Sequence, residues 1–224
     1  MNTQVHLGAG TMHLVQSILI AYLQAESVPL TSMVINTSNR DTVLMGEYNL
    51  RSVLPFIPLL SSIGHFATAV YPTHQSELQY GEYAISASLM VYVIATLSGI
   101  LDIRSLVTLC LLNAVLQWIG HRVETSARGP SRNHLLLLGF SIHTIIWANV
   151  ATSFYTTLKL NDAVDSVPPM VYTIIITMFG LFTTFGVWAV IDSKERENGF
   201  VLLSFLCKTL LIWMMFFGLR REVE

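Results

Sequence analysis

Residues 199–218 read GFVLLSFLCKTLLIWMMFFG and contain a single charged side chain, that of Lys208. At about 1.5 Å per residue, a helix of this length spans the roughly 30 Å hydrocarbon core of a bilayer, which places Lys208 near its centre. With nine or more residues on each side, the side chain is too short to reach either headgroup layer. Such a cation pairs with an internal partner, lines a cavity or serves a ligand. A desolvated lysine also forms Schiff bases with aldehydes.

The overall composition is that of a membrane protein, whose main partner is lipid. Of the 224 residues, 53% are hydrophobic and only 12% are charged, which is too apolar for a soluble domain of this size. The net charge of −2 leaves no basic surface for nucleic acid. Cys110 and Cys207 both lie in apolar segments, so we expect neither a disulfide framework nor a metal site. Nothing marks a second domain, and we treat residues 1–224 as one.

Seven apolar segments follow one another along the chain: 5–24, 50–71, 77–101, 103–123, 134–158, 167–191 and 199–219. The predicted fold is therefore an all-α membrane protein, a bundle of seven transmembrane helices. Most connections between the segments are short. The exception is residues 26–49, which alternate β-branched and polar residues around Asn39-Arg40-Asp41. This pattern fits either a short β-hairpin over one mouth of the bundle or an unstructured loop.

The loop charges do not decide how the bundle is oriented in the membrane. An excess of lysine and arginine marks cytoplasmic loops, but the face that bears the N-terminus has five of these residues and the opposite face has six. The first group is Arg122, Arg128, Arg132, Lys194 and Arg196, and the second is Arg40, Arg51, Arg104, Lys159, Arg220 and Arg221. Composition alone leaves the orientation open.

Glu82 is the expected partner of Lys208. Their two segments begin on the same face of the membrane, and the helical rise places Glu82 about 7 Å and the Cα atom of Lys208 about 13 Å inside that face. Side chains on a helix lean toward its N-terminus, so the lysine points back toward the depth of the glutamate. In a low dielectric the two charges stabilise each other, as the counterion of a protonated Schiff base does. A purely structural ion pair is the alternative.

Three polar side chains fall within the first two apolar segments. His13 and His65 lie in TMHLVQ and SSIGHFA, and Ser61 lies one turn before His65 on the same helical face. They form either a cluster that takes or relays a proton near neutral pH or ordinary residues of the core with satisfied hydrogen bonds.

Two serines stand beside the predicted charged pair. Ser86 lies one turn after Glu82, and Ser204 lies one turn before Lys208. Both are therefore placed to hydrogen-bond in that region. Isolated serines in membrane helices usually bond their own backbone instead.

Aromatic side chains are frequent in the last three apolar segments, where most residues of this kind pack in the core or face lipid. A long conjugated ligand attached to Lys208 would need flat apolar walls, and these segments could supply them. The aromatic residues concerned are Trp147, Phe179, Phe182, Phe185 and Trp213.

The chain resembles the heliorhodopsins, a family of retinal-binding seven-helix proteins distinct from the pump-type microbial rhodopsins. The matching stretches, in chain order, are HLVQ, SSIGH, EYAISASLM, LNAVLQWIG, VYTIIITMFGLFTTF and ERENGFVLLSFLCKTLLIW. The patterns EY-x-x-SAS and LS-x-x-x-K-x-x-x-x-W are the most specific of these. The resemblance covers nearly the whole chain.

The resemblance implies that all-trans retinal is bound to Lys208 as a protonated Schiff base, with Glu82 as its counterion. It also implies a cytoplasmic N-terminus and a homodimer. The residues expected around retinal are Ser61, Ser86, Ser204, His13, His65, Tyr83, Trp147 and Phe182. This chain departs from the family pattern in having Gln79-Tyr80 in place of Arg-Trp, Ala84 in place of serine, and Gln117 at an expected apolar position.

Three functions follow as hypotheses. The first is a photoreceptor, not an enzyme, in which retinal isomerisation drives a conformational signal to an unidentified partner. The second is a light-gated ion channel for protons, since Glu82, His13 and His65 could line a route through the membrane. The third is a non-retinal seven-helix transporter, although the sequence lacks the paired broken helices typical of that class. The first two hypotheses are not separated by the sequence.

Overall fold

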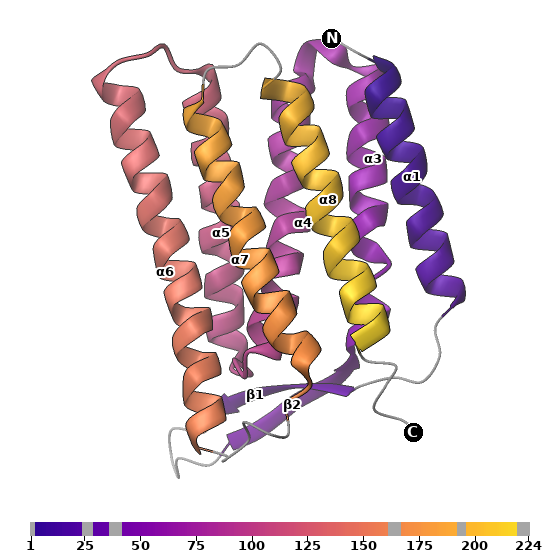
Figure 1. Ribbon diagram of the computed structural model, residues 1–224, viewed down its shortest axis with the longest axis vertical. Coiled ribbons are helices and arrows are strands. Elements are labelled where there is room, and N and C mark those ends of the chain that lie inside the picture. The colour runs from indigo at the N-terminus through magenta and orange to yellow at the C-terminus, as the bar shows by residue number, and fades with distance from the viewer. Residues whose placement is uncertain (1–2, 24–28, 36–41, 161–166, 192–195, 219–224) are drawn as a thin grey trace.

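The computed structural model describes residues 3–23, 29–35, 42–160, 167–191 and 196–218. Seven longer helices of this described part form one bundle (Figure 1). They are α1 (Thr3–Tyr22), α3 (Phe56–Val70), α4 (Gln75–Leu97), α5 (Ile103–Thr125), α6 (Pro130–Leu160), α7 (Pro169–Val190) and α8 (Arg196–Gly218). The predicted helical bundle is thus confirmed. Both α1 and α8 begin at one end of the bundle and run toward the other (Figure 1).

Proline and glycine set helix boundaries that differ from the predicted ones. The segment predicted as one helix from residue 50 is broken, since α2 (Leu50–Val53) ends before Pro55 and α3 begins after it. Proline lacks an N–H group and its ring clashes with the preceding turn. The next helix, α4, ends earlier than predicted, and Gly99 follows it with φ +88, a conformation that L side chains rarely adopt. A Cβ atom at Gly99 would also collide with Thr157.

Two strands lie between α1 and α2. β1 (Pro29–Ile35) pairs antiparallel with β2 (Thr42–Asn49), with Pro29 opposite Asn49 and one irregularity in the register. In Figure 1 the two strands cross the end of the bundle at which α8 ends. Residues 36–41, which join the strands, lie outside the described residues.

The outer surface of the bundle suits a membrane. Among the described residues, five helices are long and apolar enough to cross a bilayer: α4 together with η1 (Pro72–His74), and α5, α6, α7 and α8. Of the other two, α3 is apolar but has only 15 residues. Large apolar side chains such as Leu111, Leu137 and Ile176 point outward from α5, α6 and α7, which lipid favours and water does not. The chain is a multi-pass membrane protein.

Helix α4 runs through the interior. It packs against α3 and α5 and also contacts α6 and α7, and its buried side chains extend from Gln79 to Thr96. Helix α8 packs against α7 and α1. The buried polar residues of α4 and α8, among them Ser86, Ser204 and Lys208, are therefore held inside the bundle and away from lipid.

Candidate functional site

Lys208 and Glu82 meet inside the bundle. The Nζ atom of Lys208 donates a hydrogen bond to Oε1 of Glu82 at 2.7 Å, and the two side chains are only 3% and 7% exposed. Ser61, on α3, donates from its Oγ atom to the same oxygen at 2.7 Å. The contact predicted from helix depth is confirmed. Enclosed charges persist only when further hydrogen bonds satisfy them, which Ser61 does here.

A glycine on α3 makes room for the carboxylate. A Cβ atom at Gly64 would lie 2.8 Å from Cβ of Glu82 and 2.5 Å from its Cγ atom, closer than such atoms approach one another. Gly64 stands one turn after Ser61, so the same face of α3 provides both the space and the hydrogen-bond donor. This arrangement sets how closely α3 and α4 pack beside the ion pair.

The predicted serines lie in the same interior region. Ser86 and Ser204 are 0% and 2% exposed, with Ser86 beside Glu82 and Ser204 beside Tyr83. Neither hydroxyl meets the distance and angle of a hydrogen bond to the described residues. Buried hydroxyls normally find a partner, so these two are available to water or to a bound ligand.

The predicted histidines lie beside the ion pair, and a third joins them. The rings of His13 and His65 stack with centroids 5.7 Å apart, and Nδ1 of His6 lies 3.1 Å from Nδ1 of His65. None of the three is more than 5% exposed. His6 was not predicted as a site residue, although its spacing gave a clue. His6, Gly10, His13 and Ser17 recur every three or four residues and form the buried face of α1.

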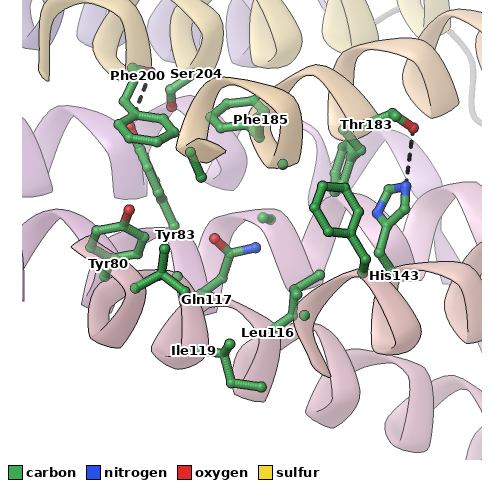
Figure 2. A pocket seen from close by; sticks show the side chains of 18 of the residues that line it. Tyr80, Tyr83, Leu116, Gln117, Ile119, His143, Thr183, Phe185, Phe200 and Ser204 are labelled. Atoms are coloured by element: carbon green, nitrogen blue, oxygen red, sulfur yellow. Dashed lines mark hydrogen bonds between the residues drawn. The ribbon is translucent and has the colours of Figure 1, made fainter. Parts of the chain in front are cut away.

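An apolar pocket opens on the other side of Lys208, among α4 to α8. Its empty space, counted together with the open mouth, is about 940 Å³. Figure 2 shows Tyr83, Phe185 and Phe200 around one part of it and His143 with Thr183 around another. The lining also includes Met90, Leu116, Gly139, Phe182, Gly186, Ser204, Cys207 and Lys208.

Tyr83 joins the pocket to the ion pair. Its hydroxyl donates to the carbonyl of Phe200 at 3.2 Å and accepts from Nε2 of Gln79 at 2.9 Å. The Nζ atom of Lys208 lies 5.0 Å from the centre of the Tyr83 ring, within the range of a cation–π interaction. Gln79, which departs from the family pattern, therefore acts by holding the tyrosine.

Phe182 and Trp147 were both expected beside the ligand, but the structure places them differently relative to the pocket. Phe182 lines it, whereas Trp147 lies one layer further out and packs its ring edge-on against Phe182, with centroids 5.7 Å apart. Gln117 projects among the apolar side chains (Figure 2). Its amide has no hydrogen-bond partner within the described part of the chain. One polar group with unused hydrogen-bonding capacity thus stands in an otherwise mostly apolar wall.

Fold and site together define a multi-pass helical membrane protein in which an enclosed lysine faces an apolar pocket. The family model for heliorhodopsin matches residues 3–219. The chain belongs to the heliorhodopsin family, as its motifs predicted, and this family consists of light-sensing rhodopsins that bind retinal through a lysine. Comparison with curated proteins found no match to the chain.

The chemistry of the pocket lining suits such a chromophore. Lys208 is the lysine that opens onto it, and the walls are mainly aromatic and aliphatic. The Ser204 hydroxyl beside them is buried and has no hydrogen-bond partner among the described residues. A long conjugated molecule would be held by flat apolar contacts along its length and by the lysine at one end. Lys208, Tyr83, Phe182 and Phe185 are the residues that would hold it.

Proposed function

We propose that this protein is a photoreceptor in which all-trans retinal is bound to Lys208 as a protonated Schiff base and Glu82 is the counterion. The observation that carries the proposal is the 2.7 Å contact between Lys208 Nζ and Glu82 Oε1 at the edge of an apolar pocket. When bound, retinal supplies light absorption and isomerisation. The surrounding residues determine the charge, the shape and the water content of its site.

Each protein group has a physical role in this proposal. The negative charge of Glu82 holds a proton on the Lys208 nitrogen, because opposite charges in a low dielectric stabilise each other. Ser61 orients the carboxylate by donating to Oε1. Tyr83 and Phe182 keep water from one side of the lysine and position a flat ligand. A change of shape in the pocket then moves the helices, and the moved bundle is the signal that a partner reads. No catalytic activity is proposed.

Reconstitution with all-trans retinal tests the proposal. The wild-type protein should gain a visible absorption band that hydroxylamine removes, and Lys208→Ala should express without colour. Lys159→Ala is the matched control, because Lys159 is exposed near the end of α6, over the ring of Tyr155, and should leave the band intact. A coloured Lys208→Ala protein would refute the assignment.

A light-gated proton channel is the second candidate, and one observation favours it. The titratable residues His6, His13, His65 and Glu82 lie within the same part of the bundle and are almost completely enclosed, as groups that line a proton route would be. A passive route gives a photocurrent that reverses near the proton equilibrium potential. Voltage-clamp recording across a pH gradient decides the question. If a coloured protein at the cell surface gives no photocurrent, the channel hypothesis is rejected and only the photoreceptor hypothesis remains.

Orientation and assembly are further proposals. We propose a cytoplasmic N-terminus on the family resemblance, and labelling of a tag at residue 1 tests it.

We also propose a homodimer. It is supported by small side chains that point outward from α6 at steps of four residues, as at many helix interfaces in membranes. They are Thr144, Ala148, Thr152 and Thr156. Replacing Thr152 with a bulky residue should shift the dimer toward monomer in crosslinking.

A further inference from the structure

The buried imidazoles of His6 and His65 form one hydrogen bond with each other, and in both rings the atom involved is Nδ1. Nδ1 of His6 lies 3.1 Å from Nδ1 of His65, and the residues are 1% and 5% exposed. A hydrogen bond between ring nitrogens needs one N–H group and one bare nitrogen. When both rings are neutral, the two Nδ1 atoms therefore hold a single proton between them. The pair has two arrangements, which differ in which ring carries that proton.

The second nitrogen of His65 is unused, and the charges of Lys208 and Glu82 act on the same imidazole. Its Nε2 atom is buried and has no hydrogen-bond partner among the described residues. The titratable and charged groups near the pair come from four helices: His13 on α1, stacked on His65, His65 itself on α3, Glu82 on α4 and Lys208 on α8. His65 can thus gain a proton at Nε2 and give one up at Nδ1.

We propose that His6 is the outer member of a histidine relay that takes over the proton of the Lys208 nitrogen. The proton passes from that nitrogen to Glu82 Oε1, 2.7 Å away. The carboxyl group then protonates His65 at Nε2 while the Nδ1 proton of His65 crosses to Nδ1 of His6. At each step one bond to hydrogen breaks and one forms, and the positive charge moves from Lys208 to His6.

The relay has a direction because of where His6 lies. His6 is in the first turn of α1, which begins at Thr3, so the charge ends close to the end of the bundle where α1 and α8 begin (Figure 1). The relay deepens the proposed function and relies on it for the source of the proton. The hydrogen bond between the two histidines does not depend on that function.

The first test uses the full chain without retinal. With ¹⁵N-labelled histidine, NMR should detect a scalar coupling between the two Nδ1 nuclei across the hydrogen bond. His6→Asn should abolish this coupling. His74→Asn should keep it, because His74 is exposed and contacts only Glu77 among the charged groups described. A wild-type protein without the coupling overturns the shared proton.

The second test follows the pigment after a flash. His6→Asn and His6→Gln should keep the dark colour, since Glu82 is the group that hydrogen-bonds Lys208. Both variants should lower the yield or lifetime of the form with a deprotonated lysine nitrogen by about tenfold or more. A pH-indicator dye should lose its transient response in parallel. Wild-type kinetics in both coloured variants would overturn the relay. A wild-type chain that forms no pigment would instead overturn the proposed function and, with it, the proton source.

Discussion

Lys208 stands between two unlike walls. On one side, α1, α3 and α4 present three histidines, Ser61 and the Glu82 carboxylate. On the other side, α5, α6 and α7 present mainly aromatic and aliphatic side chains around a pocket. The polar wall can hold or move charge, whereas the apolar wall mainly gives shape and excludes water, although Gln117, His143 and Thr183 also line it. The comparison teaches that one lysine can serve proton chemistry and ligand packing at once, because the two groups of side chains lie on different sides of it, even though α4 contributes to both.

Glycine is used differently in the two walls. On the polar side, Gly64 lets Glu82 lie against α3, and a Cβ atom at Gly10 would come within 2.9 Å of the Phe66 ring. On the apolar side, a Cβ atom at Gly186 would come within 2.9 Å of the Phe140 ring, in the lining of the pocket itself. The missing side chain of Gly64 thus leaves room for a carboxylate, whereas those of Gly10 and Gly186 leave room for aromatic rings.

Removing the charge of the polar wall should have the largest effect. In Glu82→Gln the Lys208 nitrogen loses the anion that holds its proton, so the pigment should either shift to longer wavelength or bleach to the ultraviolet at neutral pH. Spectral titration from pH 4 to pH 10 measures this. Glu82→Asp keeps the charge and should remain close to wild type. An unchanged spectrum and titration in Glu82→Gln would contradict the role of counterion.

Displacing the same carboxylate without removing it should have a smaller effect. In Gly64→Ala the new methyl group would meet Cβ and Cγ of Glu82, so the carboxylate must move away from Lys208. The band and its titration should shift in the direction seen for Glu82→Gln, but by less. Gly81→Ala is the matched control, because a Cβ atom at Gly81 has nothing within 4 Å. Equal shifts in the two alanine variants would show that Gly64 has no special role.

The two walls also differ in how far the sequence predicts them. Lys208 and Glu82 could be paired in advance because the helical rise alone gives the depth of each residue. His6 was missed, because its spacing with His13 marks one face of a helix, but only the packing of α1 against α3 shows that this face is buried. Trp147 was expected at the ligand, but it packs against Phe182 instead. Its distance from the pocket depends on how α6 and α7 are placed beside each other, which the depth of a residue in the membrane does not predict.

In the fold as well, some features follow from the sequence and others depend on local contacts. Apolar length predicted the seven longer helices of the described part, since each must satisfy its own backbone hydrogen bonds in lipid. The exact ends were less predictable because they depend on local groups. Pro55 divides the second segment, and Gly99 lets the chain turn beside Thr157 after α4.

A change in the apolar wall should tune the pigment without affecting its proton. Gln117→Leu removes an amide that has no partner among the described residues, so the pocket loses a dipole but no charge. The absorption maximum should move by less than in Gly64→Ala, and the titration midpoint should stay where it is. Gln117→Asn keeps an amide and serves as the control. A displaced midpoint in Gln117→Leu would mean that the two walls are not independent.

A residue outside both walls should affect stability and leave colour alone. Asp102 caps α5, where its carboxylate accepts hydrogen bonds from the backbone N–H and the hydroxyl of Ser105, each at 2.8 Å. These bonds hold the pKa of Asp102 below its ordinary value. A depressed pKa means that the stabilisation is present at neutral pH and is lost as the pH falls below about 4.

Asp102→Ala should therefore lower the free energy of unfolding by about 1 kcal/mol at pH 7, the usual effect of losing such a cap. The difference from wild type should shrink at pH 3, where the carboxylate of the wild-type protein takes up a proton. Asp102→Asn keeps a neutral cap, so its stability should not show this pH dependence. Denaturant unfolding at the two pH values, followed by helical circular dichroism, gives the comparison. An Asp102→Ala protein as stable as wild type at pH 7 would show that the cap does not contribute to stability. A shifted absorption band in this variant would show that the N-terminal end of α5 is coupled to the pocket.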